Sequence, residues 1–232
     1  MCGRYARRSD KQRIAEAMSA GVPAFEIGAT FNAAPQSFQP VVRSKRETGE
    51  REIVLMRWGL VPYWSKDQKI AYSTINAKAE TIATSPAFRE ALRYRRCLVP
   101  ADAFYEWQKL DAKTKQPYAI ALKSGEIYAF AGLWERWKDE KTQAPLETFT
   151  IITTDPNELV EPLHNRMPVI IPRRDYERWL APCEPDRLPI DLLRPYPVEE
   201  MTAWKVIAAV GNVRNDRPEL IEPARQADLG HL

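Results

Sequence analysis

Short segments rich in β-branched and aromatic residues, separated by polar stretches, dominate the chain and predict strands. They do not alternate regularly with helices, which argues against a parallel sheet built from strand-helix units. We therefore predict an α+β fold, mainly antiparallel β with barrel-like curved sheets and a few short peripheral helices. A Lys123-Ser124-Gly125 hairpin is expected to join two strands. The predicted strands span residues 52–58, 69–75, 103–108, 118–122, 127–134, 148–153 and 204–209.

Four short stretches predict helices instead. In the first, Ser9 and Gln12 form a capping-box pattern, and Ile14, Ala17 and Met18 then recur at helical spacing. The second has Ser85 as N-cap and Pro86 at the first helical position. The predicted helices span residues 10–19, 86–92, 155–161 and 173–180.

The organisation of the chain is simple. No repeat, low-complexity run or Ser/Gly-rich linker interrupts the 232 residues. We expect one domain over residues 1–223 and a frayed tail over residues 224–232.

Composition excludes several classes of protein. The 34 Lys and Arg against 31 Asp and Glu give a charge of +3, which is too small to establish a polyanion partner by itself. The glycines form none of the patterns of a dinucleotide fold, a P-loop or a nucleophile elbow. Three scattered cysteines and two histidines predict neither disulfides nor a metal site, so we expect no metal and no cofactor. No membrane span or leader is expected, and we predict a cytoplasmic location.

Cys2 is the first residue with distinctive chemistry. Removal of Met1 would place a free α-amine and a thiol on this one residue. Such an aminothiol can form a Schiff base with an aldehyde and then close to a five-membered thiazolidine. The alternative is that Cys2 is an incidental small residue near a terminus.

Two groups are candidates for proton transfer. Glu106 lies in Phe104-Tyr105-Glu106-Trp107, and burial among these aromatics would raise its pKa. Strand alternation could equally point Glu106 to solvent. His164 is the one histidine before the C-terminal tail and titrates near neutral pH when unperturbed, although a lone histidine is more often structural.

Basic and aromatic residues occur together in several places, as binding of single-stranded nucleic acid requires. Arg4 lies in a basic N-terminal stretch, and Tyr63 and Trp64 lie in an aromatic stretch near Lys66 and Lys69. Each basic stretch could also be an ordinary solvated face.

Seven motifs together resemble the SOS-response-associated peptidase-like (SRAP) family, whose members shield abasic sites in single-stranded DNA by covalent attachment. Each motif is weak alone, but they occur in family order over nearly the whole chain. They are Cys2-Gly3-Arg4-Tyr5, Phe31-Asn32-Ala33-Ala34-Pro35, Trp58-Gly59-Leu60-Val61-Pro62, Asn76-Ala77-Lys78-Ala79-Glu80, Pro100 to Trp107, His164-Asn165-Arg166-Met167-Pro168 and Val210-Gly211-Asn212-Val213.

The resemblance implies a function and roles for nine residues. Cys2 would attack the ring-opened aldehyde of an abasic deoxyribose, with Asn76 binding the amine and sugar. Glu106 would shuttle protons, and His164 would assist ring opening. The resemblance also implies DNA contacts: Arg4, Lys78 and Arg166 to phosphates, Thr153 as a further candidate, and Trp64 stacked on a base. Lys78 stands where the family commonly has Arg. A lysine keeps the positive charge but cannot make the two parallel hydrogen bonds that a guanidinium makes to a phosphate.

Two alternatives to covalent capture of single-stranded DNA remain at this point. Cys2 could be the nucleophile of a thiol peptidase, including one that removes its own Met1. The chain could also bind single-stranded DNA without a covalent bond. For each of these we expect a monomer.

Overall fold

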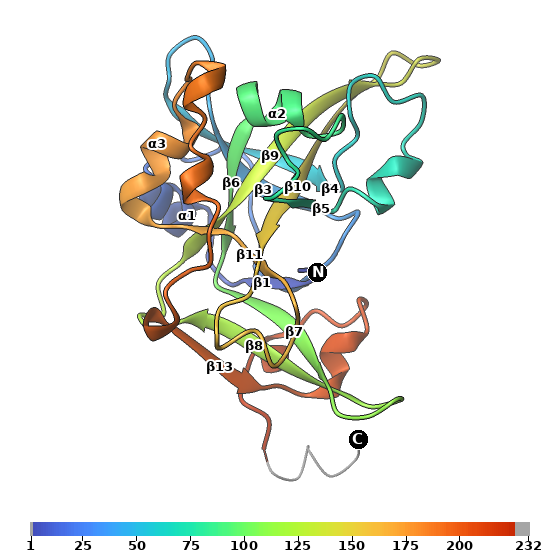
Figure 1. Ribbon diagram of the computed structural model, residues 1–232, viewed down its shortest axis with the longest axis vertical. Coiled ribbons are helices and arrows are strands. Elements are labelled where there is room, and N and C mark those ends of the chain that lie inside the picture. Colours follow the sequence, from blue (N-terminus) through green and yellow to red (C-terminus); the bar gives the residue numbers. More distant parts are fainter. Residues whose placement is uncertain (1, 226–232) are drawn as a thin grey trace.

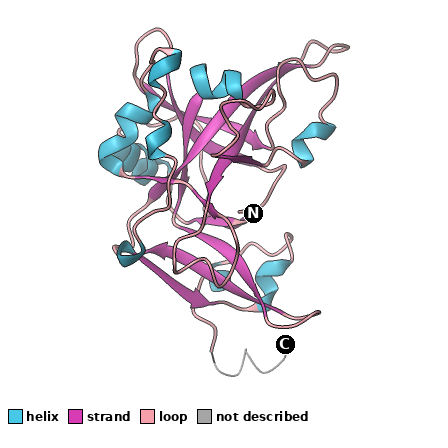
Figure 2. Ribbon diagram, viewed as in Figure 1, coloured by secondary structure: helices cyan, strands magenta, loops and turns pink. Residues whose placement is uncertain are grey.

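The structure is a computed structural model that describes residues 2–225. It is an α+β fold of mostly strands, with a closed barrel, a curved sheet and a few short helices (Figures 1 and 2). This confirms the predicted fold class. None of the described helices combines the length and hydropathy needed to cross a bilayer.

The barrel closes because β9 pairs antiparallel with both β6 and β10. The strand order is then β10-β4-β3-β6-β9 and back to β10. Two pairings differ from the expected antiparallel pattern, since β4 and β5 both run parallel to β10. The barrel strands are β3 (Phe38–Ser44), β4 (Arg51–Trp58), β6 (Arg96–Ala101), β9 (Tyr128–Lys138) and β10 (Pro145–Thr154), with β5 (Asn76–Lys78), β11 (Met167–Pro168) and β12 (Ile170–Ile171) attached.

The second sheet has the order β13-β8-β7-β1-β2. The chain passes from the barrel to this sheet at Asp102, between β6 and β7. The Asp102 carboxylate fixes this crossing, because it accepts hydrogen bonds from the backbone amides of Arg8 (2.6 Å) and Ser9 (3.2 Å). The strands are β1 (Tyr5–Arg7), β2 (Thr30–Ala33), β7 (Ala103–Lys109), β8 (Lys115–Leu122) and β13 (Met201–Lys205).

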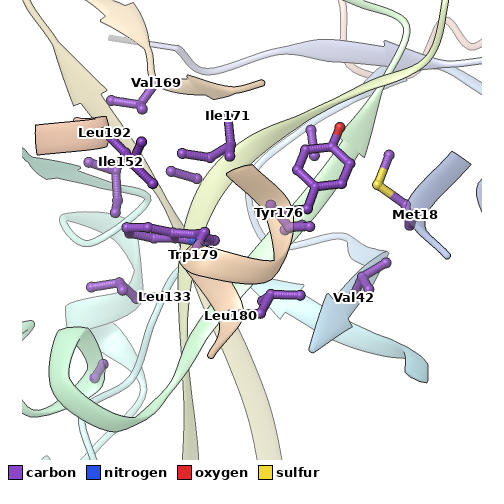
Figure 3. Packing of buried hydrophobic residues seen from close by; sticks show 14 of the residues in the cluster. Met18, Val42, Leu133, Ile152, Val169, Ile171, Tyr176, Trp179, Leu180 and Leu192 are labelled. Carbon is purple, nitrogen blue, oxygen red and sulfur yellow. The ribbon is translucent and has the colours of Figure 1, made fainter. Parts of the chain in front are cut away.

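Helices cover the outer face of the barrel. In α1 (Lys11–Met18), Asp10 is the N-cap and accepts the Arg13 amide at 2.9 Å. Met18 of α1 and Trp179 of α3 belong to one buried cluster against the barrel strands (Figure 3). The remaining helices are α2 (Arg89–Tyr94), α3 (Tyr176–Leu180) and the 3-10 helices Lys69–Tyr72, Arg173–Asp175, Pro185–Arg187, Ile190–Leu192, Val198–Glu200, Ala208–Gly211 and Pro218–Leu220.

A second cluster of aromatic residues fills the space between the barrel and the sheet. Tyr5 of β1 packs on Trp58 and Phe130 of the barrel, with ring centroids 5.4 and 5.7 Å apart. Phe104 of β7 and Cys2 belong to the same buried cluster. The N-terminal segment therefore lies where the two sheets meet, as the position of the N label in Figure 1 shows.

Several predicted elements are wrong at the local level. Residues 69–75 form a 3-10 helix and a turn, and residues 155–161 form loop and turn where a helix was predicted. Residues 123–125 do not make a hairpin, because β8 and β9 belong to different sheets. Asp10 replaces Ser9 as N-cap, since the Ser9 hydroxyl lies 3.2 Å from Asp102. The second helix begins at Arg89, after the turn that Ser85 starts.

The predicted division into a domain over residues 1–223 and a frayed tail over residues 224–232 stays a prediction. At the start of that tail, Ala224 donates its amide to the carbonyl of Lys205 at 2.9 Å. Residues 226–232 lie outside the described residues.

Candidate active site

Cys2 lies immediately before β1 and is fully buried. Burial raises the pKa of its thiol, and the nearby Glu106 carboxylate raises the pKa further. A hydrogen bond from the Arg4 backbone amide opposes this rise. In this environment the thiol holds its proton at neutral pH.

Glu106 lies on β7 with only 2% of its surface exposed. Alternation along the strand puts it on the same face as Phe104, which packs in the cluster that contains Cys2. Desolvation raises the pKa of the carboxyl to about 8. Its Oε1 has no hydrogen-bond partner among the described residues. The alternative that Glu106 faces solvent is therefore wrong, because both faces of this sheet are covered.

His164 lies in the loop between β10 and β11 and is half-buried. Burial lowers the pKa of its imidazole, and the positive amino terminus of the chain lowers it further. The same amino terminus also acts on Glu106, where it opposes the effect of burial. The pKa values of Glu106 and His164 therefore both respond to the charge of the amino terminus.

Nδ1 of His164 faces the backbone of Arg166. It lies 3.0 Å from the Arg166 amide nitrogen and 3.3 Å from the Arg166 carbonyl oxygen. The ring accepts from the amide in one tautomer and donates to the carbonyl in the other.

Asn76 is held at the start of β5 and is 9% exposed. It lies opposite Ile151 of β10, whose carbonyl accepts the Asn76 Nδ2 at 3.3 Å. Its Oδ1 is buried without a hydrogen-bond partner among the described residues, as is Oε1 of Glu106. Buried polar atoms without partners are uncommon, and an amide oxygen such as Oδ1 can accept a hydrogen bond from a ligand.

Arg166 and Thr153 come together on the barrel beside β5. Arg166 Nη2 donates to the Thr153 carbonyl at 2.8 Å, and both Nη atoms also contact the carboxylate of Glu80. The Thr153 side chain is 1% exposed, so its backbone carbonyl makes this contact. Lys78 pairs with Thr153 in the parallel register, and its side chain is exposed.

Arg4 uses its guanidinium inside the protein. Nη1 donates to Asn32 Oδ1 at 2.7 Å and to the Val210 carbonyl at 2.8 Å, and Nη2 donates to the Gly211 carbonyl at 3.1 Å. The group also lies 6.0 Å from the centroid of the Trp107 ring. Arg4 therefore joins three of the motifs named above, and this leaves fewer of its donors for a phosphate.

Residues 59–68 form a segment that we call the aromatic loop. Trp58, directly before it, is fully buried and donates Nε1 to the Ile75 carbonyl at 2.9 Å. Tyr63 and Trp64 are 59% and 50% exposed. Only these two rings of the aromatic stretch are presented to solvent.

Two polar residues of the motifs have contacts that the sequence did not reveal. Asn32 is 4% exposed and ties Arg4 to the backbone of residues 210–215. Glu80 forms the ion pair with Arg166. In both cases the sequence offered only a polar residue inside a family motif. Arg166, the partner of Glu80, is 86 residues away along the chain, and the backbone partners of the Asn32 amide are 178 or more residues away. Among residues 2–225, no group of three or more His, Cys, Asp or Glu is placed to hold a metal ion.

Comparison with known proteins gives consistent results. Residues 1–213 match the family model described as SOS response associated peptidase (SRAP). The chain is 44% identical over 226 residues to the abasic site processing protein YoqW of Bacillus subtilis, covering 96% of this chain and 99% of that protein. It is 34% identical over 224 residues to the abasic site processing protein HMCES of Gallus gallus, covering 84% and 66%. A crystal structure of a protein from Bacteroides thetaiotaomicron has a TM-score of 0.85 and 27% identity, and covers 97% of this chain and all of that one.

Proposed function

Because the chain belongs to the SOS response associated peptidase (SRAP) family, we propose that it captures abasic sites in single-stranded DNA. In this proposal Met1 is removed, and Cys2 then forms a covalent thiazolidine with the damaged sugar, which shields the lesion. The names of the relatives, abasic site processing proteins from a bacterium and a vertebrate, support this assignment of the substrate.

The observation that carries the proposal is the buried carboxyl of Glu106 next to Cys2. An aldehyde-trapping aminothiol needs a group that both donates and accepts protons near neutral pH. Glu106, with a pKa of about 8 set by desolvation, has substantial populations of both forms there. His164 supplies a second neutral group, since burial and the charge of the amino terminus lower its pKa.

The proposed reaction has three proton-balanced steps. First, the closed sugar opens to its aldehyde, with Glu106 or His164 moving the hemiacetal proton to the ring oxygen. Second, the Cys2 amine adds to the aldehyde carbon and water leaves, which gives an imine. Third, the Cys2 sulfur bonds to the imine carbon while the thiol proton passes to the nitrogen. The sum is amine, thiol and aldehyde giving thiazolidine and one water, with no oxidant or reductant.

Asn76 and the basic residues would hold the DNA. The unpartnered Oδ1 of Asn76 can accept a hydrogen bond from the amine or a sugar hydroxyl. Lys78 and Arg166, which lie on either side of Thr153, would pair with phosphates, and Arg4 would contribute its remaining donors. Trp64 would stack on a base beside the lesion. Capture of genomic DNA then places the protein in the cytoplasm, at the nucleoid in a bacterium.

A denaturing gel tests the proposal. Met1-free protein is incubated with a labelled single strand that carries one abasic site, and a denaturation-resistant band of slower mobility is expected. Cys2→Ala keeps the α-amine but lacks sulfur, so we expect a band only after borohydride reduction of the imine. A chain with retained Met1 should give no thiazolidine band.

Cys183→Ala is the matched control, because Cys183 is a free, partly exposed cysteine on another part of the chain. It should react like the wild type. Absence of any band from Met1-free wild type would reject covalent capture and leave the non-covalent binder. An undiminished band from Cys2→Ala without borohydride would reject Cys2 as the residue that makes the stable bond. Turnover of peptides without DNA would favour the thiol peptidase.

A further inference from the structure

The backbone of the aromatic loop is fixed to the barrel by polar side chains that are themselves buried. The Val61 amide donates to Oγ1 of Thr148 at 2.9 Å. The Ser65 carbonyl accepts Nε1 of Trp137 at 2.6 Å. Thr148 is fully buried and Trp137 is 2% exposed. These two bonds lie on either side of the exposed pair Tyr63 and Trp64.

Further contacts restrain the same segment. The Tyr63 amide hydrogen-bonds the carboxylate of Glu135, which is 5% exposed and pairs with Arg95 at 2.8 Å. Val61 packs in a small buried cluster with Ala71 and Trp137. The loop backbone is therefore held on strands β9 and β10, while the rings of Tyr63 and Trp64 remain available.

Such an arrangement has a specific consequence for binding. A ring on a mobile loop loses conformational entropy when a base stacks on it, and this loss reduces affinity. A ring on a fixed backbone has lost the backbone part of that entropy before DNA arrives, so only its side-chain torsions are ordered on binding. Stacking on an aromatic side chain contributes about 1–3 kcal/mol per base, so the preorganisation of one ring changes affinity measurably.

We propose that Thr148 and Trp137 are positioning residues for DNA binding, because they preorganise the aromatic loop as a platform for the unpaired bases next to the lesion. This inference rests on the proposed function for the identity of the ligand. It assigns to two buried residues a role that acts through Trp64 and Tyr63, without contact to DNA.

The test compares two substitutions on one strand. Thr148→Val removes the acceptor of the Val61 amide and keeps the side-chain shape. Thr150→Val is the matched control, since Thr150 is also fully buried on β10 and its hydroxyl has no hydrogen-bond partner. The probe is a single strand with a tetrahydrofuran abasic analogue, which has no aldehyde, next to a fluorescent 2-aminopurine that is quenched when it stacks.

We expect Thr148→Val to weaken binding roughly five-fold, a part of what loss of a whole stacking contact would cost, and to reduce the quenching. Thr150→Val should change neither. With aldehyde-bearing DNA, Thr148→Val should raise the DNA concentration for half-maximal adduct rate and leave the maximal rate unchanged. In a Trp64→Ala background, Thr148→Val should have little further effect on quenching or affinity.

Equal binding by Thr148→Val and Thr150→Val would overturn the inference. The inference would also be overturned if Thr148→Val weakened binding as much in the Trp64→Ala background as in the wild type. Such a result would mean that the substitution acts through a general loss of structure and not through the Trp64 ring. Should Thr148→Val not fold, Trp137→Phe removes the other bond, and Trp179→Phe is its control, since Trp179 also donates Nε1 to a carbonyl in a buried site. The tetrahydrofuran analogue binds without forming an adduct. Its affinity therefore tests the positioning role even if the proposed covalent reaction does not occur.

Discussion

Arg166 and Glu80 form a bidentate ion pair, with Nη1 2.7 Å from Oε1 and Nη2 2.9 Å from Oε2. The hydrogen bonds from Arg166 hold the pKa of Glu80 below its usual range. The arginine side chain is 13% exposed and the glutamate side chain 47%. A guanidinium proposed to bind phosphate therefore faces a carboxylate that competes for the same donors.

Glu80→Gln is expected to strengthen binding of single-stranded DNA several-fold at low salt. The substitution removes one negative charge beside the proposed phosphate position, while Asp155 still pairs with Nη1 of Arg166 at 2.9 Å. The gain should shrink as salt screens the charge. Fluorescence anisotropy at low and high salt measures it, and Glu50→Gln, which breaks the remote pair with Lys45, is the control. Weaker binding by Glu80→Gln would instead make Glu80 a support for Arg166.

Glu106 gives a predicted pH dependence of stability. In the chain that retains Met1, the folded-state pKa of about 8 lies above the value of about 4.3 for an unfolded glutamate. The folded state thus binds the proton more tightly. Its stabilising contribution is complete below pH about 4.3 and is lost as pH rises through about 8.

Glu106→Gln should remove this dependence. Thermal unfolding should show that the variant gains stability over wild type as pH rises from about 5 to about 9. Glu126→Gln, at an exposed site, should follow the wild type over the same range. If the difference in stability between Glu106→Gln and the wild type stayed the same at every pH, the Glu106 carboxyl would not titrate in this pH range.

The same substitution should slow the chemistry. At saturating abasic DNA, Glu106→Gln is expected to lower the rate of adduct formation by about 10²-fold or more, the usual contribution of a general acid or base. Affinity for the unreactive tetrahydrofuran strand should stay within a factor of about two. Reactions stopped at successive times over a series of pH values measure the rate of adduct formation and the pH at which this rate changes. An unchanged rate would assign the proton transfers to His164.

The sequence predicted several strands that are rich in residues with a strong strand preference, but it missed the barrel strands β3 and β6. It also failed where contacts with distant segments decide the local structure. Strands β4, β7 and β9 are rich in β-branched and aromatic residues and lie close to the predicted ranges. Residues 69–75 have similar composition, yet Thr74 Oγ1 bonds the Leu60 and Ile70 carbonyls and favours a turn. The Lys123-Ser124-Gly125 turn looked local, but its flanking strands pair with different sheets.

The candidate site shows the same limit. Cys2, Asn76, Glu106 and His164 were named from chemistry and from motifs. The sequence could not predict how deeply these residues are buried, because their burial depends on the packing of the sheet against the barrel. The sequence also does not reveal that Oδ1 of Asn76 has no hydrogen-bond partner, or that Thr148 and Trp137 hold the aromatic loop. Both features depend on pairings between distant segments.

Asn32→Ala should destabilise the protein strongly. The Asn32 Nδ2 lies 2.8–3.2 Å from the carbonyls of Val210, Asn212 and Asn215, and Oδ1 accepts from Arg4. Loss of the amide leaves buried polar groups unpaired, at a cost of about 1–3 kcal/mol for each. Urea unfolding should show a lower midpoint for Asn32→Ala, and a still lower one for Asn32→Asp, because a carboxylate would face three carbonyl oxygens. Equal stability of Asn32→Asp and wild type would contradict this.

Gly59, at the start of the aromatic loop, is a position where backbone strain and steric conflict add. Its φ is +119°, and an added Cβ would lie 2.5 Å from the Ala71 carbonyl oxygen and 2.8 Å from Gln36 Nε2. Gly125 also has a positive φ, +68°, but a Cβ there meets no atom within 4 Å. Gly125→Ala should therefore cost only the left-handed strain of about 1–2 kcal/mol.

Gly59→Ala should cost more than Gly125→Ala for two reasons: a φ of +119° lies outside the left-handed region that alanine can adopt, and the Ala71 backbone must also move. It should displace the loop that carries Trp64. We expect a larger drop in the urea midpoint and, in the protein that remains folded, reduced quenching of a 2-aminopurine next to the abasic analogue. Gly125→Ala should leave the quenching unchanged. If the two alanine variants lose the same stability and quench equally, close packing at Gly59 does not set the position of the loop, and glycine is needed there only for its φ.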